Sequence, residues 1–332
     1  MKTRIDFIDT VKGLTLLFVI YLHISACYDG HPYPDSIFGI AVSTFFMPIF
    51  FILSGLFFSS KNDFIPWLKK KTKRLLIPYW FFYILTFLVS FLVVRILGVE
   101  TKNGFAWSNI FIVFHADVFS NSTIWFLLAL FWSSLFLYPI VKFLHCKWSQ
   151  LLIVVLLFCF GWTCNAFTIN IPLYFDSAMS MLPFLYFGYL LKSIDFVKYI
   201  EGQGKILLVL GLLLMMINLF TAEGTSLVNN RIGDPAHYFF GAVVGSFSII
   251  FICAFLNKIP VATFIGRNSL TVLCIHGYIL NFVTLILKKF QIDMIISSLI
   301  AFVLVTLSFY IIVPLCKRFI PWAIGEERNS DK

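Results

Sequence analysis

One apolar stretch near the N-terminus carries three ionisable side chains that could take part in chemistry, namely Asp9, Lys12 and His23. If the stretch is helical, Lys12 and His23 point within about 20° of each other and lie about 16 Å apart along the axis, with Asp9 about 40° from His23. Charged groups are costly at membrane depth, so such a stripe normally faces a bundle interior or a wet cavity and indicates a functional site. The alternative is an interfacial Asp9–Lys12 ion pair together with a packing histidine.

The densest cationic cluster of the chain lies between Lys69 and Arg74. An Arg fork suits bidentate contacts to phosphate, so the cluster could hold a polyanionic ligand at the cytoplasmic side. On charge alone, the stronger interpretation is a topology anchor that also touches anionic lipid. The residues considered for anion binding are Lys70, Lys71, Lys73 and Arg74.

A second histidine, His276, lies well inside another apolar segment. Ser269 is seven residues before it, which places the two about 20° apart on one helix face and about 10 Å apart. An imidazole at this depth indicates a polar interior, although a lone histidine is more often a satisfied packing residue. Two further candidates are Asn268, next to Ser269, and Ser54, which together with Gly55 allows helices to approach closely.

Membrane-spanning helices must position all of these residues. The chain has 332 residues, of which 60% are hydrophobic and only 12% charged, and its apolar runs reach transmembrane length. This composition excludes an ordinary soluble protein and predicts an all-α polytopic membrane protein. We expect one transmembrane domain over residues 1–320 and a cytoplasmic tail over residues 321–332, with about ten spans near 10–27, 36–58, 75–97, 124–144, 150–167, 177–191, 206–221, 237–256, 268–287 and 294–316.

The distribution of positive charge predicts the orientation. With both termini in the cytoplasm, 19 of the 25 Lys and Arg residues fall on the inner side, as the positive-inside rule requires. This segregation explains the net charge of +9 without any nucleic-acid partner. No small-residue cleavage site follows the first apolar run, so we expect it to be a retained span.

The remaining composition narrows the function classes. The seven cysteines have no metal-like spacing and are expected to be small packing residues, so no metal is expected. There is no phosphate-binding P-loop, so the chain is not an ATP-driven pump on its own.

Several of these features occur together and in the same order in the membrane-bound acyltransferase family 3, the bacterial O-acyltransferases that modify cell-surface glycans. Lys12 and His23, with ten residues between them, resemble the family's basic-residue-to-His signature, and Lys in place of the commoner Arg looks like the fucose O-acetylase-like branch. Lys71 and Arg74, followed by Pro78-Tyr79-Trp80, resemble the basic pair at the third helix. The resemblance covers nearly the whole chain and includes Phe51 to Gly55, Trp125-Phe-Leu, Pro183 to Gly188 and Gly266 to His276.

The fourth helix departs from the family pattern. Many members have a carboxylate a few residues after the Trp-Phe-Leu, whereas this chain has Ala129-Leu130-Phe131. The difference separates this chain from the branches that are fused to a secreted esterase-like domain.

The resemblance implies transfer of an acyl group, usually acetyl, from cytoplasmic acyl-CoA to a hydroxyl of a glycan or lipid-linked sugar at the outer face. In this interpretation Lys70, Lys71, Lys73 and Arg74 hold the CoA phosphates, and His23 is the general base. Lys12 positions the donor or pairs with Asp9. His276, Asn268 and Ser269 line the channel or polarise the thioester carbonyl. The implied location is the bacterial inner membrane, with membrane lipids and glycan-synthesis machinery as partners.

Two other classes of function stay open. The same polar stripe could serve an exporter or flippase of a polysaccharide or lipid-linked sugar, and a third possibility is a non-catalytic partner of a glycan synthase. The inner basic cluster favours the enzyme, because export needs no phosphate clamp on the cytoplasmic side.

Overall fold

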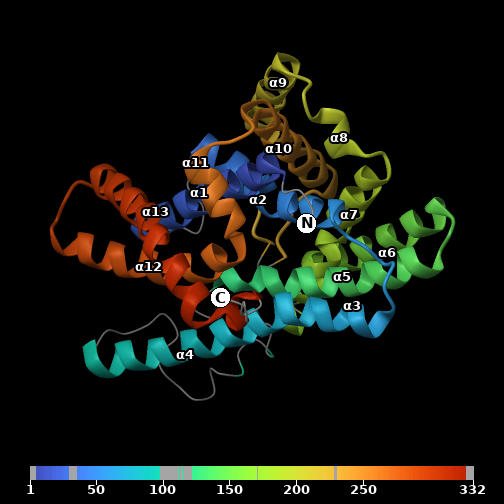
Figure 1. The fold of residues 1–332 in the computed structure, drawn as a ribbon. Helices are drawn as coiled ribbons and strands as arrows, with labels where there is room; N and C mark the ends of the chain where they lie inside the picture. Colours follow the sequence, from blue (N-terminus) through green and yellow to red (C-terminus); the bar gives the residue numbers. More distant parts are fainter. Residues whose placement is uncertain are drawn as a thin grey trace. The chain divides into compact units, whose positions relative to one another are not determined.

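The computed structural model describes residues 5–29, 36–97, 111, 114, 122–169, 171–227 and 230–326. Within these ranges there are helices and one isolated bridge between Ser226 and Arg231, but no strand, so the predicted all-α fold is confirmed (Figure 1). The α-helices are α1 (Asp6–Asp29), α2 (Ile37–Leu56), α3 (Phe64–Lys71), α4 (Ile77–Leu97), α5 (Trp125–Phe143), α6 (Lys147–Ala166), α7 (Phe175–Ser193), α8 (Phe196–Ile200), α9 (Lys205–Thr221), α10 (Pro235–Leu256), α11 (Pro260–Arg267), α12 (Ser269–Lys289) and α13 (Met294–Phe319).

Eight helical segments of the described chain are long and apolar enough to cross a membrane, which makes this a multi-pass membrane protein. Seven of them lie on α1, α2, α5, α6, α10, α12 and α13, and the eighth, Phe64–Leu92, runs from α3 into α4. The other two expected spans, 177–191 and 206–221, fall on α7 and α9. Helix α9 has only 17 residues, whereas α7 has 19 but carries Asp176 in its first turn and Lys192 in its last.

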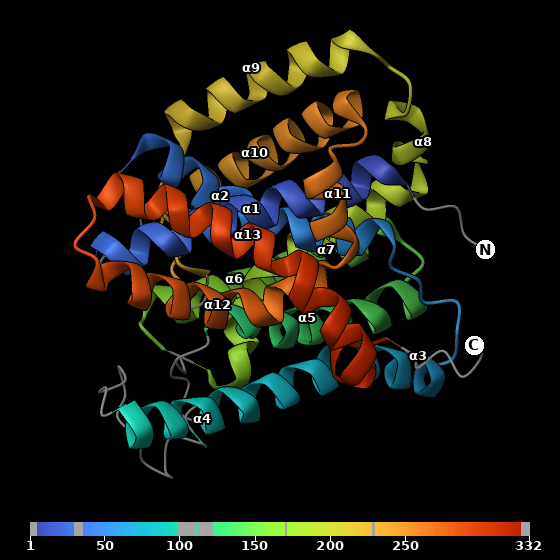
Figure 2. The same cartoon turned by 60° about the vertical axis from the view of Figure 1, so that its left-hand side comes forward.

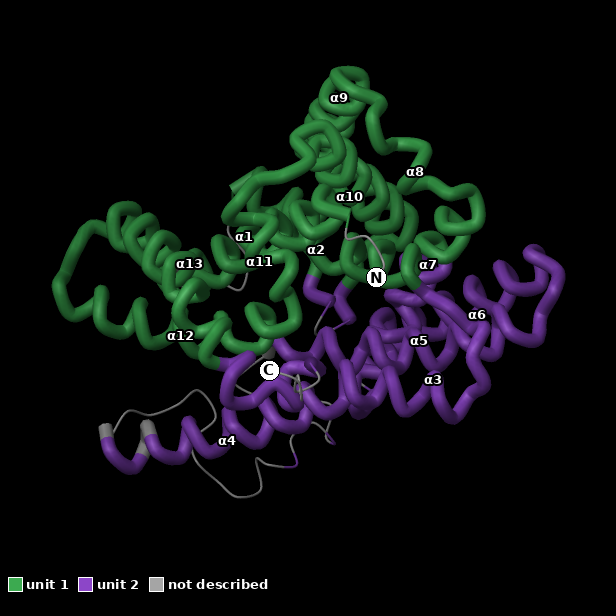
Figure 3. The backbone as a smooth tube through the Cα atoms, viewed as in Figure 1, with its two compact units in different colours: residues 1–57, 187–225, 232–315 green, residues 58–186, 226–231, 316–332 purple. Residues whose placement is uncertain are grey.

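The chain divides into two compact units, which Figure 3 colours separately. Unit 1 consists of residues 1–57, 187–225 and 232–315, and unit 2 of residues 58–186, 226–231 and 316–332. Each unit is described by itself below.

Helix α1 is the centre of unit 1. It packs against α2, α10, α11 and α12, and Figures 1 and 2 show α11 lying along it. Val11, Leu16 and Ile20 on α1 are fully buried in this packing. Helix α10 in turn packs against α2 and α9, and Figure 2 shows α9 and α10 side by side. The helix with the ionisable stripe is therefore enclosed by other helices, which favours polar groups inside a membrane domain.

Glycines allow several of these helices to touch backbone to backbone. A Cβ atom added to Gly188 of α7 would lie 2.0 Å from the Ile52 carbonyl oxygen and 3.0 Å from the Gly55 Cα of α2. The close helix approach that we predicted at Gly55 is therefore confirmed, and its partner is the final part of α7.

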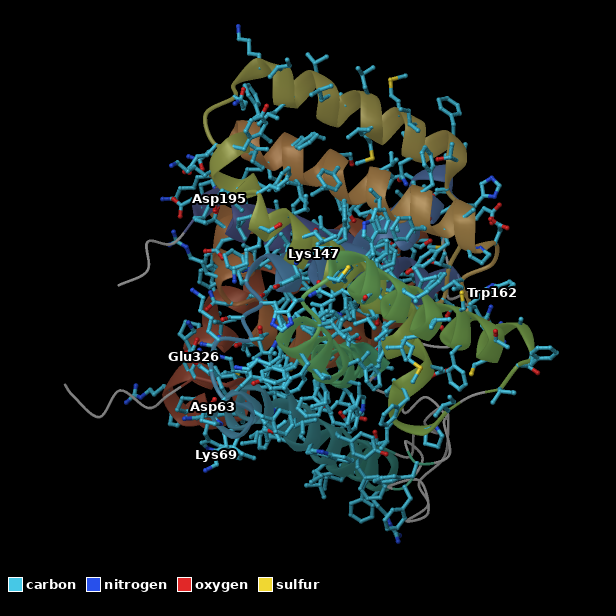
Figure 4. The ribbon with its side chains drawn as sticks, turned by 90° about the vertical axis from the view of Figure 1, so that its right-hand side faces the viewer. Asp63, Lys69, Lys147, Trp162, Asp195 and Glu326 are labelled. Atoms are coloured by element: carbon cyan, nitrogen blue, oxygen red, sulfur yellow. The ribbon has the colours of Figure 1, made fainter. Side chains whose placement is uncertain are left out.

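Unit 2 is organised around α5. The Ser133 hydroxyl donates to the Ala178 carbonyl of α7 at 2.7 Å, and the Tyr138 hydroxyl donates to the Asn62 carbonyl at 2.8 Å. Near the C-terminus, Trp322 packs edge-on against Phe81 of α4, with ring centroids 5.1 Å apart. Figure 4 shows Lys69 at one end of this unit and Trp162 at the other.

Candidate active site

The contact between α1 and α11 sets the frame of the candidate site in unit 1. A Cβ atom on Gly13 would lie 1.7 Å from the Ala262 carbonyl oxygen, and one on Gly266 would lie 1.7 Å from the Asp9 carbonyl oxygen. Two glycines, one on each helix, therefore allow the backbones to touch. The Thr10 hydroxyl bonds to the Thr263 hydroxyl at 2.8 Å and reinforces the contact.

A network of four charges lies at the start of α1. Arg267 Nη2 donates to Asp6 Oδ1 at 2.7 Å, and its Nε lies 3.7 Å from Asp9 Oδ2. Lys12 Nζ is 3.4 Å from the other oxygen of Asp9 and lies over the Phe57 ring, 5.9 Å from its centroid. The two carboxylates and two cations balance, so the structure gives Lys12 a partner in Asp9. The ion pair is one of the two roles considered for Lys12. If Lys12 positions the donor, it does so from this paired position.

Arg267 was not among our candidate residues, although it joins Asp6 and Asp9. The pairing spans more than 250 positions of the chain, which no helical periodicity could reveal. Helix α11 was missed for a related reason, because it is short. The sequence nevertheless contains signals for the two ends of α11. Pro260 lies in its first turn, where proline is common, and Asn268 follows Arg267 at its C-terminus, where asparagine is common.

The two membrane histidines come together in unit 1. The centroids of the His23 ring on α1 and the His276 ring on α12 are 5.5 Å apart, and the ring planes make an angle of 38°. His276 is fully buried, whereas His23 is half-buried. Helix packing thus joins two segments that the sequence analysis treated separately, and it places two groups capable of proton transfer beside each other.

One ring nitrogen of His276 has a hydrogen-bond partner, and the other has none among the described residues. Nδ1 lies 3.0 Å from the Val272 carbonyl oxygen, one turn earlier on α12. Nε2 is buried and has no hydrogen-bond partner among the described residues. Such an atom carries a free-energy penalty unless a further group pairs with it.

The other candidates in unit 1 are Asn268, Ser269 and Ser54. Asn268 is buried at the break between α11 and α12, where its side-chain N–H donates to the Phe264 carbonyl at 2.7 Å while its own oxygen has no partner among the described residues. Ser269 begins α12, and Ser54 lies half-buried beside Gly55 on α2. The structure brings neither serine into a hydrogen bond with His23 or His276 within the residues it describes.

The basic cluster belongs to unit 2, and its members do not share one environment. Lys70, Lys73 and Arg74 are exposed, whereas Lys71 is half-buried. Lys71 Nζ donates to the Ser134 hydroxyl at 3.1 Å and lies 5.3 Å and 5.9 Å from the ring centroids of Phe58 and Trp67. Three of the four predicted anion-binding residues therefore have exposed side chains, and the fourth is half-buried within the unit.

A π-helical turn over Thr72–Leu76 separates Lys71 from Arg74 in orientation. In a regular α-helix, residues three apart point within about 60° of each other. The wider π turn changes this relation, and such turns are frequent at functional sites. The sequence grouped Lys71 with Arg74 as members of one cationic cluster, and the charge pattern gave no sign of this turn.

No group of three or more His, Cys, Asp or Glu residues in the described ranges is placed to hold a metal ion. Unit 1 offers two imidazoles and a charge network, and unit 2 offers an exposed cationic surface.

The chain matches a known protein family. Residues 5–316 match the model of a family described as an acyltransferase domain, the acyltransferase 3 family. No curated protein and no solved structure was found to match the chain. The matched range covers both units except for residues 1–4 of unit 1 and residues 317–332 of unit 2.

Proposed function

Because the chain belongs to the acyltransferase 3 family, we propose that it is a membrane O-acyltransferase that moves an acetyl group from cytoplasmic acyl-CoA to a sugar hydroxyl of a cell-surface or exported glycan. The observation that carries this proposal is the pair of imidazoles, His23 and His276, enclosed between α1 and α12. A positioned imidazole is the commonest general base in enzymes, and acyl transfer to a hydroxyl needs one.

The proposed step is direct and balanced. His23 takes the proton of the acceptor hydroxyl while the hydroxyl oxygen attacks the thioester carbonyl carbon. The tetrahedral intermediate then collapses, the carbon–sulfur bond breaks, and the CoA thiolate receives the proton from the His23 imidazolium. The products are an O-acyl sugar and free CoA, and no metal or oxidant is required.

The donor end of the reaction is assigned to unit 2. The exposed residues Arg74, Lys70 and Lys73 offer a cationic surface suited to the CoA phosphates. Lys71, held by Ser134, would support the π turn that presents Arg74. Lys12 in place of Arg favours the fucose O-acetylase-like branch within the family, and Ala129 in place of a carboxylate separates the chain from the branches fused to a secreted esterase-like domain.

Arg74→Ala is expected to weaken acyl-CoA binding about 10- to 100-fold, because hydrogen bonds to charged groups contribute about 1.5–3 kcal/mol. Binding of acetyl-CoA to the purified protein, measured by calorimetry, tests this. Lys61→Ala removes an exposed positive charge from the same unit and should leave the affinity unchanged. If Arg74→Ala and Lys61→Ala both bind acetyl-CoA as tightly as the wild type, Arg74 does not have the phosphate-binding role.

The proposed function is tested by transfer of radiolabelled acetyl from acetyl-CoA to envelope glycan in membranes that contain the protein. The expected result is alkali-labile label on glycan, present with the protein and absent from matched membranes that lack it. Succinyl-CoA in a parallel reaction tests the acyl group. If neither donor gives labelled glycan with any acceptor tested, the export function becomes the better explanation.

We propose the bacterial cytoplasmic membrane as the location, with both termini inside. Cys146, in the short loop between α5 and α6, is then on the cytoplasmic face and is exposed. The backbone N–H groups of Ser149 and Trp148 hold the pKa of its thiol below the ordinary value. The thiolate is the nucleophile, so its reactive form persists to a lower pH than in a free thiol.

A membrane-impermeant maleimide should therefore label Cys146 in inside-out vesicles and not in right-side-out vesicles. The labelling rate should rise with pH through a midpoint that lies below that of glutathione measured in parallel. Cys146→Ser identifies the signal from this residue. A midpoint at or above that of glutathione would contradict the lowered pKa, and labelling from outside would reverse the orientation.

A further inference from the structure

We infer that His276 is a positioning residue for His23: its Nε2 atom accepts a hydrogen bond from an N–H of the His23 ring and so decides which His23 nitrogen carries the reactive lone pair. The inference rests on the proposed function, in which His23 is the general base. It assigns His276 a role different from polarising the thioester carbonyl, one of the roles that the family resemblance implied.

The protonation pattern of His276 follows from its backbone contact. A carbonyl oxygen only accepts hydrogen bonds, so the 3.0 Å contact with Val272 requires the proton on Nδ1. In the neutral ring, Nε2 then has a lone pair and no proton. His276 consequently has no N–H left for the thioester oxygen, and what it offers to its surroundings is a hydrogen-bond acceptor.

The acceptor atom of His276 is fully enclosed. The side chain has no exposed surface, and Nε2 has no partner among the described residues. Leaving such an atom unpaired is costly, and in native proteins a buried polar group without a partner calls for a functional explanation. A donor that pairs with it during the reaction supplies that explanation.

The His23 ring is the neighbouring group that can supply the donor. Its centroid is 5.5 Å from that of His276, on a helix packed against α12. Catalytic hydrogen bonds are often long before substrate binds and tighten in the complex. A small rotation of the half-buried His23 ring is therefore the motion that the proposal requires.

A hydrogen bond to His276 would orient His23 as a general base. A base whose one nitrogen donates to a fixed acceptor presents its other nitrogen, unprotonated, to the nucleophile. Here the substrate proton moves to the free nitrogen of His23 and later to the CoA thiolate, while the N–H to His276 stays in place throughout. His276 gains and loses no proton in the cycle.

Three variants of the full-length protein in nanodiscs separate positioning from packing. His276→Leu removes the acceptor and should lower kcat about 100-fold with the KM for acetyl-CoA within about two-fold. His276→Gln keeps a carbonyl acceptor and should lie within about 10-fold of the wild type. Thr284→Val, which removes a buried hydroxyl bonded to the Leu280 carbonyl on the same helix, should match the wild type.

Nitrogen-15 NMR of histidine-labelled protein provides a readout that needs no turnover. His276 should show a protonated Nδ1 and an unprotonated Nε2, and His23 should show one dominant tautomer that becomes a mixture in His276→Leu. His23→Gln and His276→Gln assign the two signals. If the wild type proves inactive with every acceptor, the proposed function fails, whereas this spectrum still decides the positioning role.

Three results would overturn the inference. One is a protonated Nε2 on His276 in the wild-type spectrum. Another is full activity in His276→Leu. The third is a loss in His276→Gln as large as in His23→Gln, which would mean that His276 exchanges protons itself. Should His276→Leu fail to fold, the wild-type spectrum and the Gln variant remain decisive.

Discussion

Gly266→Ala is expected to abolish acyl transfer and to lower the thermal stability of the protein. The new methyl carbon would lie 1.7 Å from the Asp9 carbonyl oxygen, and backbone atoms cannot move aside as the end of a flexible side chain can. Helices α1 and α11 must therefore separate. Overpacking typically costs about 1–3 kcal/mol, and this separation also breaks the Thr10–Thr263 hydrogen bond and the Arg267–Asp6 ion pair.

The loss should extend to activity because α11 leads directly into α12, which carries His276. Thermal melting monitored by size-exclusion chromatography measures the loss of stability, and the acetyl-transfer assay measures the loss of activity. Gly224→Ala is the matched control, since a Cβ at Gly224 meets no atom within 4 Å. Wild-type melting and activity in Gly266→Ala would contradict the α1–α11 contact.

Gly13→Ala tests the same contact from the other helix, against the Ala262 carbonyl oxygen. The double variant should be little worse than either single one, because one separation of the helices relieves both clashes. Residues that share a contact are non-additive in this way, whereas two independent defects would add.

His23→Gln is expected to lower kcat for acyl transfer by about 10²–10⁴-fold, the usual contribution of a general base. Glutamine has a similar volume and can hydrogen-bond, but it cannot accept the proton of the acceptor hydroxyl. Acetyl-CoA affinity should stay unchanged, because the proposed phosphate contacts belong to Arg74 and its neighbours. Transfer of radiolabelled acetyl by equal amounts of each protein measures the change in kcat.

The control for this variant is His237→Gln. His237 lies in the first turn of α10 and is exposed, with 62% of its side-chain surface accessible. It should retain wild-type transfer. Activity in His23→Gln equal to that of this control would move the base elsewhere, and a loss of acetyl-CoA binding would show that His23 supports the donor rather than the proton transfer.

Local patterns were enough to predict most of the helices. Apolar runs of transmembrane length placed the spans, and each of the ten expected segments falls on a helix. The stripe of Asp9, Lys12 and His23 follows from the rotation per residue in a single helix, so neighbours within one helix can be derived without a tertiary structure. Short helices such as α3 and α11 escaped because they lack the length that makes an apolar run distinctive.

The pairing of residues across helices depended on packing and needed the tertiary structure. The sequence marked His23 and His276 as unusual, yet their proximity arises because α1 and α12 pack together. Arg267 joins Asp9 only through the close contact that Gly13 and Gly266 permit. Lys71 donates to Ser134 on another helix, and a π turn follows it before Arg74. Each of these depends on contacts between distant segments or on a departure from regular helix geometry, and composition and periodicity contain neither.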